Sequence, residues 1–197
     1  PDTIAIRDLT ILPEASFTEL APQTSCDPLQ PNGRLQANAV INGVVQNPAD
    51  FTFEWFEGQN TITAHTGGTS GVNGQVAEGV KGGGQAFTVR ITTANQCSVT
   101  KDTVINEIIN YPLIALGTTP NSVCDQALGF TGSVSSTVTF GGNAITAGNP
   151  DYTFEWYDGP TATGTPVNLN QQNYVNLDSG FYTLVVTNTV RNCPSVA

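Results

Sequence analysis

The sequence predicts an all-β protein built of two tandem β-sandwich domains. Three observations carry this prediction. Apolar and polar residues alternate over short segments, Gly, Pro and Asn separate these segments, and the 197-residue chain repeats itself with a period of about 96 to 101 residues. No segment shows the 3.6-residue apolar period of an amphipathic helix.

The repeat is clearest in two aromatic segments. "DFTFEWFEG" at 50–58 and "DYTFEWYDG" at 151–159 share six of nine residues. About 100 residues per repeat, with a Trp in a central strand, is typical of immunoglobulin-like sandwiches. We therefore predict tandem immunoglobulin-like β-sandwich domains at 12–110 and 111–197.

Alternation within these segments predicts the cores. In 51–56, Phe51, Phe53 and Trp55 alternate with Thr52, Glu54 and Phe56, the period-2 pattern of a half-buried strand. Residues 35–41, 87–91 and 182–186 alternate in the same way. The core aromatic residues that we expect are Phe53, Trp55, Phe154 and Trp156.

The segment 65–85 interrupts the repeat with eight glycines. We expect a flexible loop there. The alternative is a contact loop, because loops on rigid sandwiches often carry function.

The ends of the chain extend the repeat. "PDTIAI" at 1–6 resembles "KDTVIN" at 101–106, where we expect the last strand of the first repeat. Residues 1–11 are therefore predicted to be the last strand of a preceding repeat or a donor strand, and the second repeat is predicted to lack its last strand. The donor residues would be Thr3, Ile4, Ala5 and Ile6.

Each repeat holds two cysteines, 71 and 69 residues apart. An even number at repeating positions predicts disulfides, Cys26–Cys97 and Cys124–Cys193, each clipping one end of a sandwich. A zinc site would need closely spaced cysteine pairs, and the sequence has none. Disulfides indicate an extracellular or periplasmic setting.

Composition excludes several partners. The net charge is −10, and charged residues make up 11% of the chain against about 25% in average soluble domains. Nucleic acids and anionic membrane surfaces attract clustered Lys and Arg, which this chain lacks. No apolar run approaches the length of a membrane-spanning helix, so we expect no membrane insertion.

Candidate catalytic residues are few. The one histidine, His65, is expected to be solvated, and Glu54 and Glu155 lie in separate repeats, too far apart for a glycosidase pair. We therefore expect no enzyme and no cofactor. Calcium is a weaker alternative, because its candidate ligands near the junction are scattered: Asp102, Glu107 and Asp125.

The second repeat resembles the SprB-type repeats of surface adhesins from gliding Bacteroidota, which the type 9 secretion system exports. The resemblance rests on Cys124, the strand at 151–159, "NLDSGFYTLVV" at 176–186 and Cys193. The first repeat matches at Cys26, 51–58, 87–91 and Cys97 but lacks the Asn-Leu-x-x-Gly element. Both repeats are longer than the usual family unit.

This resemblance implies a non-catalytic adhesin stalk at the cell surface, whose partners are neighbouring repeats or copies of the same chain. One alternative is an extracellular filament assembled by strand donation between chains. Another is a glycan-binding module using exposed aromatic residues such as Phe56 and Tyr157, although packing between sheets or against a neighbouring domain explains these residues better. Asp-Thr-apolar sequences fit the Bacteroidota O-glycosylation pattern at Thr3 and Thr103.

Overall fold

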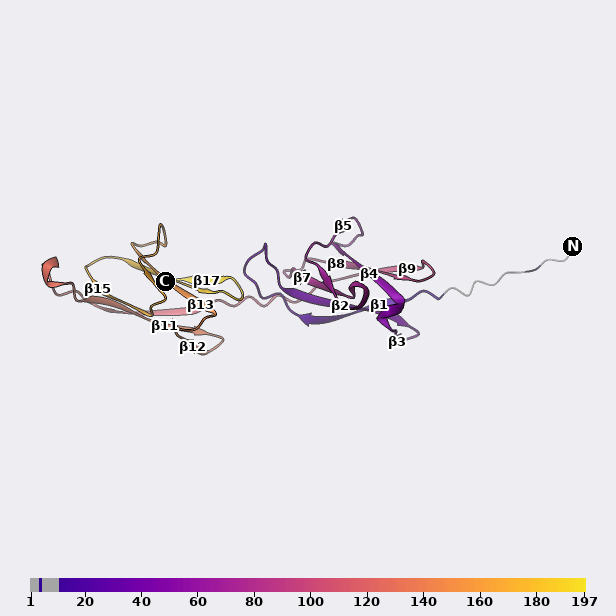
Figure 1. Cartoon of the computed structure of the whole chain (residues 1–197), viewed down its shortest axis with the longest axis horizontal. Helices are drawn as coiled ribbons and strands as arrows, with labels where there is room; N and C mark the ends of the chain where they lie inside the picture. Colours follow the sequence, from indigo (N-terminus) through magenta and orange to yellow (C-terminus); the bar gives the residue numbers. More distant parts are fainter. Residues whose placement is uncertain (1–3, 5–10) are drawn as a thin grey trace. The chain divides into compact units, whose positions relative to one another are not determined.

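The computed structural model describes Ile4 and residues 11–197, which form two compact units (Figure 1). Unit 1 consists of Pro1–Thr24 and Pro28–Ile108. Unit 2 consists of Ile109–Ala197 together with the short segment Ser25–Asp27, which lies in the connection between the first two strands of the chain.

Unit 1 is a sandwich of two antiparallel sheets. The first sheet, in spatial order, contains β1 (Glu14–Ala21), β2 (Gly33–Ile41), β7 (Val76–Val80) and β6 (Thr69–Ser70), with β3 (Val44–Val45) also paired to β2. The second contains β5 (Thr63–Ala64), β4 (Phe51–Glu57), β8 (Phe87–Thr93) and β9 (Ser98–Thr103).

Unit 2 repeats this plan. One sheet contains β10 (Leu113–Thr119) and β11 (Gly132–Phe140), with β12 (Asn143–Ile145) and β15 (Asn173–Leu177) both paired to β11. The other contains β14 (Asn168–Leu169), β13 (Tyr152–Asp158), β16 (Tyr182–Asn188) and β17 (Cys193–Val196). Three short 3₁₀ turns complete the described elements: η1 (Pro48–Asp50), η2 (Val72–Gly74) and η3 (Gln126–Leu128). The predicted all-β, tandem immunoglobulin-like fold is confirmed.

Alternation along the strands produces the two cores. Every second residue of β4 and β13 points between the sheets, so Phe53 and Trp55 are 5% and 4% exposed and Phe154 and Trp156 are fully buried. The indole N–H groups still need partners after burial. That of Trp55 donates to the carbonyl of Gly74 (2.9 Å) and that of Trp156 to an equivalent carbonyl, described below.

The glycine-rich segment 65–85 is not the flexible loop that we expected. It supplies β6, η2 and β7, and its glycines allow close approaches. Gly74 has a φ of +77° and provides the carbonyl that Trp55 uses, while the Asn73 amide donates to the carbonyl of Phe51 at 2.8 Å. Glycine at position 74 therefore allows the backbone conformation in which this carbonyl meets the Trp55 indole.

The second repeat does not lack its last strand altogether. β17 pairs with β16 in the position that β9 takes beside β8, although it has four residues where β9 has six. Apart from Ile4 and Ile11, the predicted donor segment 1–11 lies outside the described residues, as do Thr3, Ala5 and Ile6.

Candidate functional site: the cysteine loops and hairpins

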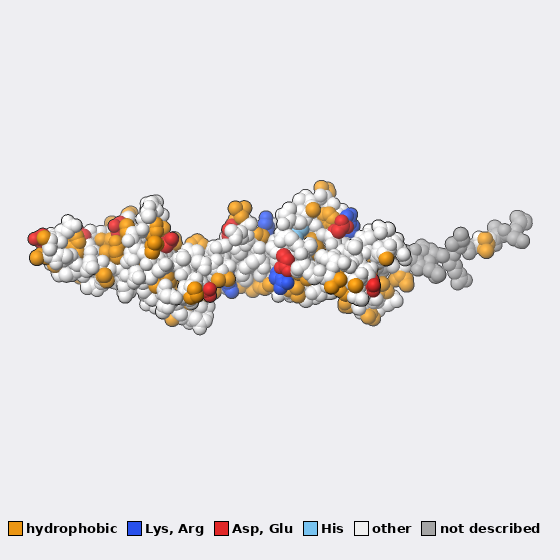
Figure 2. Space-filling view, in the orientation of Figure 1, with side chains coloured by type: hydrophobic (Ala, Val, Ile, Leu, Met, Phe, Trp, Pro, Cys, Tyr) orange, Lys and Arg blue, Asp and Glu red, His pale blue; other side chains and the backbone are white. Residues whose placement is uncertain are grey.

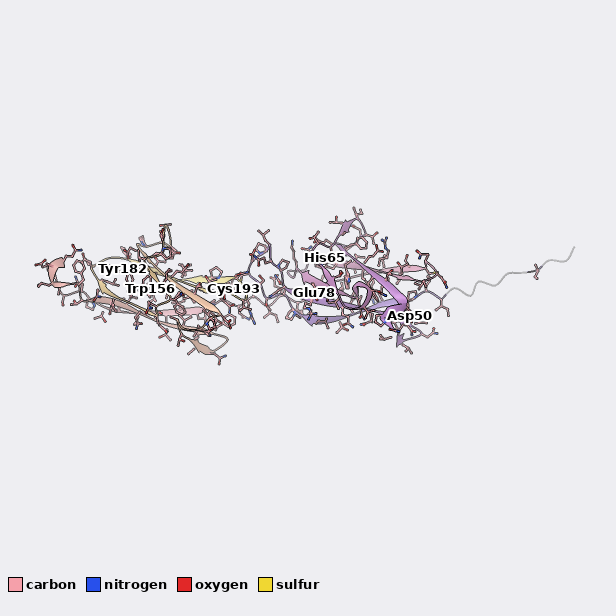
Figure 3. The ribbon with its side chains drawn as sticks, viewed as in Figure 1. Asp50, His65, Glu78, Trp156, Tyr182 and Cys193 are labelled. Carbon is pink, nitrogen blue, oxygen red and sulfur yellow. A yellow bond between two sulfur atoms is a disulfide. The ribbon has the colours of Figure 1, made fainter. Side chains whose placement is uncertain are left out.

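The cysteine pairing differs from the prediction. Cys26 is bonded to Cys193, and Cys97 and Cys124 are free thiols in the described part of the chain (Figure 3 labels Cys193). The predicted pairs Cys26–Cys97 and Cys124–Cys193 are therefore wrong. The bond that forms joins the first cysteine of repeat 1 to the second cysteine of repeat 2.

Strand register explains why Cys26 cannot reach Cys97. The loop that holds Cys26 leads into Gly33, which lies beside Ile105, just past the end of β9. The end of β9 is paired with Phe87, the first residue of β8, whereas Cys97 bonds to Thr93 at the far end of β8. Six residue steps along a strand span about 20 Å, far more than the ~5–6 Å between Cα atoms of a disulfide.

Each unit therefore has two distinct ends. At the proximal end the chain enters its first strand, and the hairpin with the second cysteine lies there. At the distal end the last strand finishes, and the loop with the first cysteine lies there. We call these elements the second-cysteine hairpin (93–97 and 188–193) and the first-cysteine loop (23–33 and 121–132).

The two second-cysteine hairpins share three features, although three residues separate the paired ends of the first and four those of the second. Cys97 lies opposite Thr93, the last residue of β8, and Cys193 lies opposite Asn188, the last residue of β16. The residue before each cysteine has a positive φ, +64° at Gln96 and +52° at Asn192. The sulfur in each case faces the carbonyl two residues earlier, at 4.0 Å in the first hairpin and 3.4 Å in the second.

The two first-cysteine loops are closed by the same hydrogen bonds. In the first loop the amide of Thr24 donates to the side chain of Asn32 (2.8 Å), and the amide of Asn32 donates to the side chain of Gln23 (2.8 Å). In the second loop the amide of Ser122 donates to Thr131 (3.0 Å), and the Thr131 amide donates to Asn121 (3.0 Å), at the equivalent positions.

Gly33 in unit 1 and Gly132 in unit 2 hold equivalent positions beside these loops. In unit 1, Ile105 is 4% exposed and packs on Gly33, while Gln23 forms a parallel bridge with Glu107. In unit 2 a groove of about 340 Å³ lies beside Gly132. Its lining includes Pro120, Asn121, Gly132, Leu177, Asp178 and Tyr182.

His65 is buried, contrary to the expectation of a solvated histidine. Its side chain is 2% exposed and meets the edge of the Phe87 ring with 5.5 Å between centroids. Its Nε2 atom lies 2.6 Å from the carbonyl of Glu78, and Nδ1 lies 3.7 Å from the Glu57 carboxylate (Figure 3 labels His65 and Glu78). A short contact to a carbonyl requires a proton on Nε2, so this histidine joins two parts of the glycine-rich segment and packs them against Phe87.

Two charged pairs lie on the surface of unit 1. Arg34 donates to Glu78 through Nε (2.7 Å) and Nη2 (3.0 Å), and Arg90 donates to Glu54 through Nε (2.8 Å). These hydrogen bonds lower the pKa of Glu78 and of Glu54 below the ordinary value of 4.5. Charged side chains are otherwise sparse on the visible face of the molecule (Figure 2).

The lowered pKa of Glu78 predicts loss of stability in acid. The folded state binds this proton more weakly than the unfolded chain, so the contribution is complete above about pH 4.5 and disappears as the pH falls through the lowered pKa. We expect Glu78→Gln to reduce the acid dependence of unit 1 and to cost at most about 1 kcal/mol at neutral pH, because the pair is at the surface.

Urea unfolding between about pH 3 and pH 7 measures this effect. A Trp156→Phe background leaves Trp55 as the sole indole, so its fluorescence reports on unit 1. Glu14→Gln, which changes an exposed carboxylate on β1, is the matched control. The same acid dependence in the Glu78→Gln and Glu14→Gln variants would contradict the prediction.

The other predicted site residues are dispersed. Thr103 ends β9 and its hydroxyl donates to the carbonyl of Val104 (3.3 Å), so its O-glycosylation stays a prediction. Phe56 is 8% exposed beneath the Arg90 guanidinium, 5.2 Å from the ring centre, which leaves little aromatic surface for a sugar. Tyr157 is half-buried and donates to Glu155 at 3.3 Å.

Among the described residues, no group of three or more His, Cys, Asp and Glu side chains is placed to hold a metal ion. In the same part of the chain, no helix has the length and apolar character needed to cross a membrane.

No protein-family model and no curated protein matches the chain. Among solved structures, it is similar to the three N-terminal domains of the Highly Immunogenic Outer Capsid protein (Hoc) of bacteriophage RB49, with a TM-score of 0.40 and 12% sequence identity. The match covers 95% of this chain and 57% of that chain, so the present chain spans a little over half of that structure.

Proposed function

We propose that the chain is a non-catalytic structural segment of an extracellular or cell-surface array of immunoglobulin-like repeats, of the kind that extends an adhesin. The observation that supports this proposal is the disulfide between Cys26 of one repeat and Cys193 of the next. Disulfides of this kind are typical of oxidising compartments outside the cytosol. The SprB-like sequence pattern supports a gliding-bacterial surface adhesin exported by the type 9 system.

The bond has a mechanical consequence that suits a stalk. Tension applied to the two ends of the chain passes from Cys26 directly to Cys193, which lies 167 residues further along the sequence. The residues between them carry no extending force while the bond is intact. Both sandwich cores lie almost wholly within this bypassed stretch, so they stay folded under load.

Single-molecule pulling from the chain ends tests the proposal. With the disulfide intact, we expect extension only from residues before Cys26 and after Cys193. After reduction, the freed 167 residues add about 550–600 Å of contour length, at ~3.3–3.6 Å per residue. The Cys26→Ser/Cys193→Ser variant should behave like the reduced chain under both conditions. Full extension of the oxidised chain would contradict a load-bearing role.

A catalytic role has little support in the described residues. His65 is enclosed and committed to the carbonyl of Glu78, and the nearest carboxylate lies 3.7 Å away. Cys26 and Cys193 are consumed by their bond. Chemistry of the Ser-His-Asp type needs an accessible histidine beside a nucleophile, which this arrangement does not provide.

A second candidate function is assembly into a filament by strand donation, and the likeness between the segments 1–6 and 101–106 favours it. In unit 1, residues 105–107 lie beside Gly33 and Gln23. When the chain is aligned on Pro13 and Pro112, Ile6 takes the position of Ile105. In this proposal the segment 3–9 of one copy fills the groove of another, which would propagate head to tail without closing.

A peptide with the sequence of residues 2–11 tests strand donation. We expect it to bind a chain that begins at Leu12 and to protect Tyr182 and Leu177 amides, at the groove, from hydrogen exchange. A peptide with Ile6→Asp should bind at least about tenfold more weakly, because a carboxylate would replace an apolar anchor. Equal binding of the two peptides, or protection elsewhere, would contradict the proposal.

A further inference from the structure

We infer that Cys97 and Cys124 are the two halves of further disulfides of the Cys26–Cys193 type, each joining this chain to another immunoglobulin-like repeat of the same kind. Cys97 would bond to the first-cysteine loop of a preceding repeat. Cys124 would bond to the second-cysteine hairpin of a following repeat. This inference rests on the proposed function as a repeat array, and it names the partner and the bond.

The bond already formed shows what such a junction contains. Besides the sulfur–sulfur bond, the amide of Cys26 donates a hydrogen bond to the carbonyl of Arg191 at 2.8 Å. That carbonyl belongs to the turn of the second-cysteine hairpin, and it is the same one that the Cys193 sulfur faces. The junction is therefore a first-cysteine loop docked on a hairpin through backbone and sulfur together.

Cys97 lies in a second-cysteine hairpin that forms no disulfide. It has the same register opposite the last residue of the preceding strand, the same positive φ before it, and the same carbonyl, that of Asn95, two residues earlier. Cys193 is fully buried in its junction, whereas Cys97 is partly exposed. These shared features are therefore present in a bonded and in an unbonded hairpin.

Cys124 lies in a first-cysteine loop that forms no disulfide. The hydrogen bonds that close the loop of Cys26 recur in the loop of Cys124 at equivalent residues, and an Asp follows each cysteine. Cys124 is exposed, and the structure gives its thiol no disulfide partner. The chain therefore carries one complete junction and the two complementary halves of further ones.

The ends of the units at which Cys97 and Cys124 lie indicate which neighbouring repeat each cysteine would bond to. Cys97 lies at the proximal end of unit 1, where a preceding repeat would connect, and Cys124 lies at the distal end of unit 2, where a following repeat would connect. A bond between Cys124 of one repeat pair and Cys97 of the next repeats the polarity of Cys26–Cys193. The covalent loops would then overlap along the array, so that no single cut in the backbone between the cysteines separates it.

The chemistry balances with a small disulfide as oxidant. The Cys97 thiolate attacks oxidised glutathione, giving a mixed disulfide and one glutathione thiolate. The Cys124 thiolate of the partner then attacks the Cys97 sulfur and releases the second glutathione. Each protein thiol loses its proton, and two electrons pass to the two glutathione molecules.

Two single variants provide the test. The Cys97→Ser chain offers only Cys124, and the Cys124→Ser chain offers only Cys97, while both retain Cys26–Cys193. In a glutathione redox buffer, we expect their mixture to give at least about tenfold more disulfide-linked dimer than either variant alone, because docking raises the effective concentration of the two thiols. Circular dichroism and mapping of Cys26–Cys193 verify that both variants are folded.

Equal dimer in the separate samples would show unselective oxidation of exposed thiols and would overturn the inference. A mixture that stays monomeric, with both thiols still alkylated by iodoacetamide, would overturn it as well. Either result leaves the proposed load-bearing role intact if the pulling experiment shows the bypass. If the mixed variants dimerise selectively but the pulling experiment shows no bypass, only the load-bearing role is rejected.

Material from the natural source distinguishes the two possible partners. Trypsin cuts after Arg90 and Lys101 and so releases peptide 91–101, which holds Cys97. A link from this peptide to the Cys124 peptide identifies a second copy of this chain. A link to a sequence outside these 197 residues identifies a neighbouring repeat of the same polypeptide. Free thiols at both positions would overturn the inference.

Discussion

Replacing Trp156 by alanine is expected to destabilise unit 2 by about 3–5 kcal/mol, the usual cost of deleting a large buried aromatic side chain. Trp156 is fully buried, and its indole N–H donates to the carbonyl of Gln171 at 3.0 Å. The substitution removes this donor and leaves a cavity beside Tyr174, whose ring centre lies 6.0 Å away. Since a whole domain is stable by about 5–15 kcal/mol, unit 2 would become marginal.

Denaturant unfolding measures this loss, with far-UV circular dichroism following the whole chain. Trp55 remains as an internal fluorescence reporter of unit 1, whose transition should not move by more than about 0.5 kcal/mol. Phe181→Ala, which removes an aromatic side chain that is 74% exposed, is the matched control. A loss below about 1 kcal/mol for Trp156→Ala would contradict the core that the structure shows.

The sequence predicted the sandwich because its strongest signals are local ones. The alternation in 51–56 and 152–157 places Trp55 and Trp156 between sheets, and burial confirms the period of two. The repeat strengthens this prediction, because the same alternation occurs at two equivalent positions of the chain. Each strand of unit 2 has its counterpart in unit 1, and β6 is the addition.

The cysteine pairing could not be predicted from spacing, because spacing does not say at which end of a sandwich a loop lies. A first and a second cysteine recur in each repeat at a similar spacing. In unit 1, however, Cys26 and Cys97 lie at opposite ends of the sandwich, and the seven-residue strand β8 spans the distance between these ends. Strand order would have revealed this: a loop between the first two strands and a hairpin between the last two lie at opposite ends of such a unit.

The glycine-rich segment and His65 were misjudged for a different reason. Glycine lowers local strand propensity, so the segment 65–85 was predicted to be a loop. In the structure, hydrogen bonds override that propensity: the Trp55 indole binds the backbone of the segment at Gly74, and the His65 ring, within the segment, binds it at Glu78. The sequence around a single histidine does not indicate whether its side chain is buried. In the structure, the His65 ring packs against Phe87.

The Cys26→Ser/Cys193→Ser variant is expected to lose about 2–4 kcal/mol of stability, and the loss should fall on unit 2. Ser25–Asp27 belongs to unit 2, so unfolding of this unit releases the Cys26 contact, and the bond limits the freedom of the unfolded segment. Unit 1 remains folded within the closed loop, which keeps the entropic gain below that of a fully unfolded loop of 167 residues.

Urea unfolding of single-tryptophan chains separates the two effects. With Trp156 as reporter, the transition of the double-serine variant should shift to lower urea, and adding a reductant should shift the oxidised parent chain by the same amount. With Trp55 as reporter, neither change should move the transition by more than about 0.5 kcal/mol. Cys97→Ser/Cys124→Ser, which removes the two free thiols, is the control and should match the parent. If the Trp55 transition moved as far as that of Trp156, the bond would be stabilising both units, and the assignment of the Cys26 segment to unit 2 would be wrong.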